Sequence, residues 1–100
     1  MDKREEIMRA AEALAQTIRT KSASERQAMP SEIVAKQYNR IREEALKVDP
    51  KATLLPPEVP IDQAMGRIVV RARYMDIEGF CETIIKLLDT DGPGLGIASI

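Results

Sequence analysis

The residues from Ile61 to Asp89 form the most apolar stretch of the chain, and their spacing constrains the fold more than any other feature. On a helical wheel, where successive residues are about 100° apart, the apolar side chains of this stretch form two stripes on opposite sides. The first stripe comprises Ile61, Met65, Ile68, Val69, Ala72 and Met75. The second stripe comprises Val70, Tyr74, Ile77, Cys81, Ile84 and Leu88. A helix that covers a core needs only one such stripe, so the second has to be covered as well.

Two arrangements bury both stripes. In the first, the helix breaks between Asp76 and Gly79, because Asp76 is a suitable N-cap and Gly79 costs about 1 kcal/mol relative to Ala inside a helix. In the second, the helix is continuous and a further partner, such as another subunit, covers its other side. We favour the broken helix.

Two amphipathic helices are predicted before this stretch, at residues 2–20 and 30–48. The apolar residues of the first are spaced four, three and four apart; they are Ile7, Ala11, Leu14 and Ile18. Those of the second follow the same spacing; they are Val34, Tyr38, Ile41, Ala45 and Val48. Such spacing is typical of helices that pack along one another, so we expect an antiparallel helical hairpin. Residues 21–30 would connect the two helices, with Ser24 and Gln27 capping a short turn.

Prolines and glycines mark the remaining segments. Pro56 and Pro57 predict an extended crossover over residues 50–60. Gly92 and Pro93 are expected to end the last helix. The chain is therefore predicted to hold a single helical domain, residues 1–89, and a flexible glycine-rich C-terminal tail, residues 90–100.

The predicted fold class is all-α: a small helical bundle of three to four helices, built from the helical hairpin and a long or broken C-terminal helix. Hydrophobic residues make up 44% of the chain and charged residues 31%, a balance typical of a soluble globular protein. No apolar run reaches the roughly 18 residues of a membrane-spanning helix, so we expect no membrane partner. The charged opening residues differ from a secretory signal, and the chain has one cysteine, so we expect a cytoplasmic protein.

The side chains needed for most catalytic sites are missing from the sequence. The chain has no histidine, which excludes the Ser–His–Asp and Cys–His arrangements and nearly all zinc and haem sites. Cys81 lies within an apolar stripe, as expected of a buried and unreactive thiol. We therefore expect no catalytic residues, no cofactor and no metal site, and we predict that the protein is not an enzyme.

The second stripe is the predicted site of function, since an apolar surface left over after the monomer folds normally finds a partner. We expect a non-enzymatic protein that acts through helix–helix association, as a homodimer or with a helical protein partner. Its role would be oligomerisation, or that of an adaptor or regulatory subunit, and the six residues of the second stripe would form the interface.

Two other functions remain open from the sequence. The first is binding of nucleic acid through the basic residues Arg40, Lys47, Arg67 and Arg71. The net charge of −1 argues against such binding, since nucleic-acid-binding proteins usually carry a strong positive excess. The second is carriage of a small ligand in a pocket lined by Met65, Met75 and Phe80.

Overall fold

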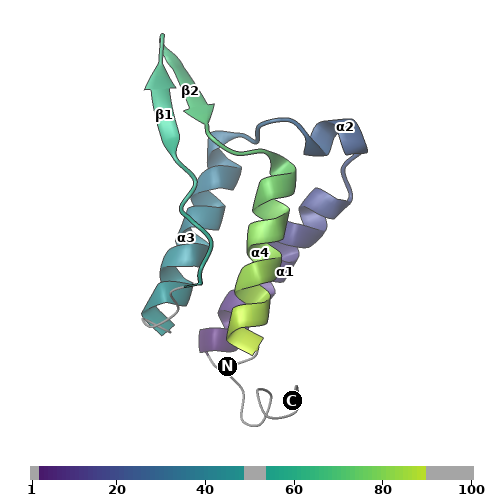
Figure 1. Cartoon of the computed structure of the whole chain (residues 1–100), viewed down its shortest axis with the longest axis vertical. Helices are drawn as coiled ribbons and strands as arrows, with labels where there is room; N and C mark the ends of the chain where they lie inside the picture. The colour runs from purple at the N-terminus through teal and green to yellow at the C-terminus, as the bar shows by residue number, and fades with distance from the viewer. Residues whose placement is uncertain (1–2, 49–53, 90–100) are drawn as a thin grey trace.

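The computed structural model describes residues 3–48 and 54–89, which contain four helices and one two-stranded sheet (Figure 1). In chain order these are α1 (Lys3–Arg19), α2 (Ala23–Arg26), α3 (Glu32–Val48), β1 (Ile61–Ala64), β2 (Arg67–Val70) and α4 (Tyr74–Asp89). The prediction of a mostly helical chain is confirmed. The all-α class is wrong in one respect, because β1 and β2 form an antiparallel hairpin.

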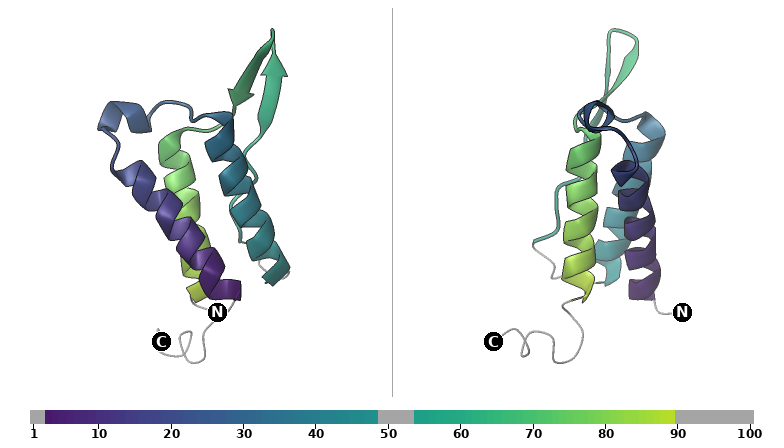
Figure 2. Two further views of the ribbon diagram at one scale, coloured as in Figure 1. Left: turned by 180° about the vertical axis from the view of Figure 1, so that it is seen from behind. Right: turned by 90° about the vertical axis from the view of Figure 1, so that its right-hand side faces the viewer.

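Helices α1 and α3 occupy the two predicted helical segments and run in opposite directions (Figure 1). The whole predicted stripe of α1 is buried, as are Tyr38, Ile41 and Ala45 of α3. The left-hand view of Figure 2 shows α1 and α3 close together where the chain begins and further apart towards α2. The 3.6-residue period of the apolar side chains thus identified both helices and their buried faces.

Helix α4 completes the core and packs mainly against α1. Ile77, Cys81, Ile84 and Leu88 point into the space between the helices and are at most 2% exposed. Each fully buried aliphatic side chain of this kind contributes about 1.5–3 kcal/mol relative to leaving it in water. The fold therefore depends on α4 as much as on the helical hairpin that the sequence predicted.

Residues 61–70 form a β-hairpin, where we predicted the start of a helix. Ile61 lies opposite Val70 and Ala64 lies opposite Arg67. The two turn residues, Met65 and Gly66, have φ angles of 54° and 76°. Positive φ at both central positions indicates a type I′ turn, whose twist matches that of two paired strands. The helical wheel missed this turn, and it also missed the β-branched residues of β2, which favour strands.

Because of the hairpin, neither arrangement predicted for the 61–89 helix is correct. The helix begins at Tyr74, and Gly79 lies within it. The carboxylate of Asp76 accepts a hydrogen bond from the Arg73 N–H (2.9 Å) at the start of α4, so Asp76 lies inside the first turn. The first stripe is therefore divided among the hairpin, the connection to α4 and the first turn of α4, and only the second stripe includes a continuous helical face.

The extended crossover is confirmed for residues 55–60, which run alongside α3 towards β1 (Figure 1). Three side chains of α3 hold its backbone. The Tyr38 hydroxyl donates to the Pro57 carbonyl (2.9 Å), and Arg42 Nε donates to the Pro56 carbonyl (2.7 Å). Asn39 pairs with both backbone groups of Val59: its Nδ2 donates to the carbonyl (2.9 Å), and its Oδ1 accepts from the N–H (2.8 Å).

The connection between α1 and α3 contains the short helix α2. Its capping box joins Ser22 and Glu25, two residues before the predicted pair Ser24 and Gln27. The Ser22 hydroxyl accepts from the Glu25 N–H (3.2 Å), and the Glu25 carboxylate accepts from the Ser22 N–H (3.0 Å). These hydrogen bonds hold the pKa of Glu25 below its ordinary value.

Two predictions concern membranes and the tail. Among the described residues, no helix is both long enough and apolar enough to cross a membrane. The predicted tail, residues 90–100, lies outside the described residues, as do residues 50–53 of the predicted crossover.

Candidate interaction surface

The six residues of the second stripe lie in the core of the single chain. Val70, Ile77, Cys81, Ile84 and Leu88 are at most 3% exposed. Tyr74 is half-buried, and the Lys21 ammonium lies 4.7 Å from the centre of its ring. A partner can reach the five buried side chains only if the monomer opens. The sequence predicts surplus surface here only if residues 61–70 belong to the same helix as α4, and in the structure they form the β-hairpin instead.

Cys81 is the one cysteine of the chain, and it is completely buried. Burial, with a smaller contribution from the nearby carboxylates of Glu82, Glu12 and Glu78, raises the pKa of its thiol to about 12. The thiol therefore stays protonated at neutral pH, and a protonated thiol is a poor nucleophile and a poor metal ligand. Its surroundings agree with the interpretation of Cys81 as a small apolar core residue.

The burial of Cys81 predicts a loss of stability at alkaline pH. An exposed thiol ionises near its ordinary pKa of 9.0, whereas the folded thiol ionises only near 12. Between these values the unfolded chain releases a proton that the folded chain keeps, so the free energy of unfolding falls as pH rises above about 9. Urea denaturation at pH 8 and pH 10.5 measures this fall. The fall should be smaller in Cys81→Ala, and an equal fall in both proteins would contradict the prediction.

Glu78 is the one buried charged residue among those that the structure describes. Its carboxylate accepts from Arg19 Nε (3.1 Å) and from Arg26 Nη2, so that α4 is tied to α1 and to α2. Arg19 also contacts Glu82 (2.9 Å). A buried carboxylate held by two guanidinium groups has its charge matched, which is typical of a structural ion-pair network. In the described ranges, no cluster of three or more cysteine, aspartate or glutamate side chains could hold a metal ion.

The four basic residues considered for nucleic-acid binding do not form one face. Arg40 and Lys47 lie on α3, which runs away from the hairpin that carries Arg67 (Figure 1). Lys47 pairs with Glu44 (3.1 Å), and Arg71 pairs with Asp62 (2.8 Å). These pairs reduce the positive charge that phosphate groups would meet, and the structure assembles no basic patch from these residues.

The ligand pocket expected around Met65, Met75 and Phe80 is not formed. Met65 lies at the hairpin turn and Met75 is 45% exposed in the first turn of α4, whereas Phe80 packs against Tyr38 with 5.6 Å between ring centres. Met65 and Met75 are exposed to solvent, whereas Phe80 packs against the core, so the structure does not place the three side chains around one pocket.

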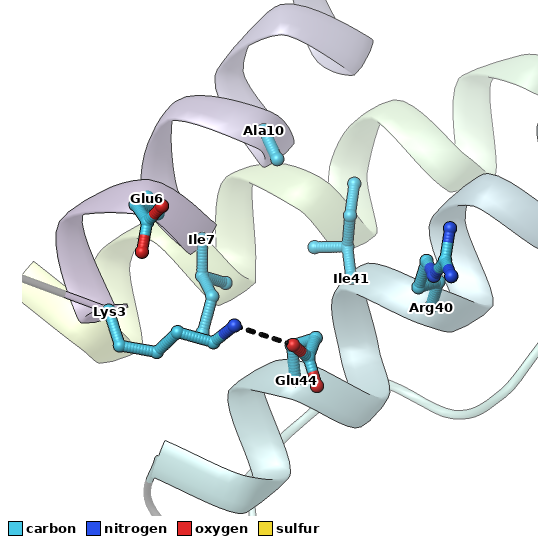
Figure 3. Close-up of a pocket in the computed structure, with 7 residues that line it drawn as sticks. All are labelled: Lys3, Glu6, Ile7, Ala10, Arg40, Ile41 and Glu44. Atoms are coloured by element: carbon cyan, nitrogen blue, oxygen red, sulfur yellow. Dashed lines mark ion pairs between the residues drawn. The ribbon is translucent and has the colours of Figure 1, made fainter.

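A different hollow of about 190 Å³ lies between α1 and α3 (Figure 3). The ion pair between Lys3 and Glu44 (2.8 Å) crosses it, and Ile7 and Ile41 supply its larger apolar surfaces. This pair holds the pKa of Glu44 below its ordinary value and raises that of Lys3. Pockets for drug-sized ligands are about 300–1,000 Å³, so this hollow is too small to hold one.

The β-hairpin projects beyond the helices (Figures 1 and 2). Its base is anchored by Val70, which is buried, by Ile61, which is half-buried, and by the hydrogen bond from the Arg71 N–H to the Pro60 carbonyl (3.0 Å). Residues 62–68 are exposed. A two-stranded hairpin with little covering is only marginally stable in water by itself, so this one keeps its shape through its base.

Met65 is the most unusual residue of the hairpin. It is the one described non-glycine residue with positive φ, and its side chain is fully exposed (101%). A side chain with a Cβ in this left-handed conformation costs of order 1 kcal/mol, and a type I′ turn favours Asn or Gly at this position. The folded chain therefore gains no contact from this methionine and carries a local strain because of it.

Exposed apolar side chains gather at the end of the molecule from which the hairpin projects. Helices α3 and α4 both begin at this end (Figure 1). Met29 precedes α3, Ile33 lies in the first turn of α3, and Met75 lies in the first turn of α4. With Met65 and Ile68 of the hairpin they form what we call the hairpin end, defined by Met29, Ile33, Met65, Ile68 and Met75. Seven large apolar residues are exposed in the described ranges, and five of them belong to the hairpin end.

The sequence contained a signal for the hairpin. Gly66 follows Met65 at the centre of the stretch, and three β-branched residues (Ile68, Val69 and Val70) follow it closely. Four residues on each side of a glycine-containing turn fit two short strands. Comparison of the chain with protein families, with curated proteins and with solved structures found no match. The geometry of the chain therefore carries the functional argument.

Proposed function

We propose that this protein acts without catalysis, as a binding protein whose hairpin end associates with another protein chain. Met65 carries this proposal. A fully exposed apolar side chain, held in a backbone conformation that favours Asn or Gly, is best explained by a contact outside the chain. The proposal retains the protein–protein association expected from the sequence, but it transfers the interface from the second stripe to the hairpin end.

The surroundings of Met65 support this proposal. Ile68, three residues further along the hairpin, is 43% exposed. The three other members of the hairpin end add apolar surface beside the base of the hairpin, and they are between 45% and 77% exposed. The two apolar side chains on the projecting hairpin, Met65 and Ile68, suit insertion into a groove or pocket of a partner, because apolar anchors at the centre of an interface usually provide much of the affinity.

Replacing Met65 with asparagine should have two opposite effects. Asparagine tolerates positive φ, so the free energy of unfolding should rise by about 0.5–1 kcal/mol. Association should weaken, because the exposed apolar side chain is lost. Urea denaturation measures the first effect. For the second, a photo-crosslinking amino acid at Gln63, on β1, reports capture of a partner in the cells that produce the protein.

Two controls make this experiment specific. Leu54→Asn removes another large exposed apolar side chain (74%) from outside the hairpin end and should leave crosslinking unchanged. A crosslinker at Glu43, which is exposed on α3, should capture no specific partner. Unchanged capture by the Met65→Asn protein, or an equal loss with Leu54→Asn, would contradict the proposed function.

A further inference from the structure

The outer edge of β2 offers unpaired backbone groups. The Arg71 N–H donates to the Pro60 carbonyl, which makes this pair a hydrogen-bonded site of the ladder. Such sites alternate along antiparallel strands, so the next ones are Asp62 with Val69 and Ala64 with Arg67. The N–H and C=O of Ile68 therefore point away from β1. No other described strand pairs with this edge.

The outer edge of β2 suits an added strand better than that of β1. The four residues of β2 include three β-branched side chains, and an apolar exposed edge of this kind readily pairs with another chain. β1 has a single β-branched residue, Ile61, whereas each strand carries one charged residue, Asp62 in β1 and Arg67 in β2. Val70 is buried at the base, so the free part of the β2 edge lies around Ile68.

The charges beside this edge indicate the character of the partner. Arg67 lies opposite the uncharged Ala64 and forms no ion pair within the described residues. Arg71 lies on the same face of the hairpin, and its pair with Asp62 is exposed. A strand added along β2 would therefore meet two positive charges: that of Arg67, which has no ion-pair partner among the described residues, and that of Arg71, which Asp62 only partly neutralises. Opposite charges on neighbouring strands are favourable by roughly 0.2–1 kcal/mol per pair, and like charges are unfavourable.

A second copy of the chain fits this edge poorly. Two β2 strands related by a two-fold axis can form hydrogen bonds in two registers. If Ile68 faces Val70 of the other copy, Arg67 of each copy lies directly opposite Arg71 of the other. If Ile68 faces Ile68, the two Arg67 side chains become diagonal neighbours on the same face. Both registers bring like charges together, which disfavours self-pairing.

We propose that the occupant of the β2 edge is an extended acidic segment of a different protein, which adds as a third strand beside Ile68 and places a carboxylate next to Arg67. This inference rests on the proposed function and specifies its partner. The backbone groups of Ile68 provide the hydrogen bonds, and the alternation of side chains provides selectivity, as in other cases of strand addition. Met65 and Ile68 supply apolar contacts next to the new strand.

Model peptides test this inference on the full chain. The probes are two capped, fluorescein-labelled eight-residue peptides in which valine alternates with glutamate or with lysine, and anisotropy at low salt measures their binding. The glutamate peptide should bind about fivefold more tightly than the lysine peptide. In Arg67→Glu the order should reverse. Lys86→Glu, the same charge change at an exposed position near the end of α4, should leave the order as in the unmodified protein.

The results separate this inference from the proposed function. Methylation of the backbone nitrogens of the glutamate peptide should weaken binding at least about tenfold, because each methyl group removes a donor. Equal binding of both peptides, no binding of either, or no reversal in Arg67→Glu overturns the inference, whereas the crosslinking at Gln63 still decides the proposed function. A homodimer that depends on the hairpin, or a preference for duplex DNA over both peptides, overturns it as well.

Discussion

Ile77→Asp should unfold the protein instead of releasing a folded monomer. The Ile77 side chain is fully buried in the core that α4 shares with α1 and α3. A carboxylate at this position would lose its hydration without gaining a partner, and it would remove apolar contacts, so the expected loss exceeds about 4 kcal/mol. A domain of this size is stable by only about 5–15 kcal/mol in total. Circular dichroism should show the loss of most helical signal at 25 °C.

The matched control is Ile33→Asp, which makes the same change at a side chain that is 77% exposed. It should alter the free energy of unfolding by less than about 0.5 kcal/mol, because a surface position keeps the carboxylate in water. From the sequence alone, Ile77→Asp was compatible with either a monomer or an unfolded chain. A folded, helical Ile77→Asp protein would show that this side chain does not lie in the core and that the packing described above is wrong.

Asn39→Ala should have the second largest effect, a loss of about 2–4 kcal/mol. The asparagine side chain satisfies both the N–H and the carbonyl of Val59, a residue that is 2% exposed. Each buried backbone group left without a partner costs about 1–3 kcal/mol, and the higher helix propensity of alanine offsets only part of this loss. Denaturation in urea measures the change, and amide exchange at Val59 should become faster than in the unmodified protein.

Two variants of α3 show whether this effect depends on the paired hydrogen bonds. Asn39→Asp keeps an acceptor for the Val59 N–H but has no donor for its carbonyl, so its stability should lie between those of the unmodified protein and Asn39→Ala. Gln37→Ala removes an exposed amide from the same helix and should have almost no effect. A loss in Asn39→Ala no larger than that in Gln37→Ala would mean that residues 55–60 are held mainly by packing.

The sequence alone determined the features that depend on local spacing and on single residues. The period of apolar residues located α1 and α3 and their buried faces, because a helix turns each third or fourth side chain to the same side. It also identified the buried residues Ile77, Cys81, Ile84 and Leu88 of α4, although it assigned them to an interface. Two adjacent prolines located the extended segment, since proline fixes φ and lacks an N–H.

Only the tertiary structure decided which apolar residues are exposed, and this is the information on which the functional argument depends. Met65 and Ile68 fit a helical period, yet the chain reverses at Met65 and Gly66 and places them outside the core. The partners of Asn39 and Glu78 were equally hidden, because hydrogen bonds and ion pairs between distant segments leave no periodic pattern. A helical wheel describes one helix by itself, whereas the exposure of a side chain depends on what the rest of the chain covers. In this protein the two-residue turn at Met65 and Gly66 keeps the hairpin residues out of the core.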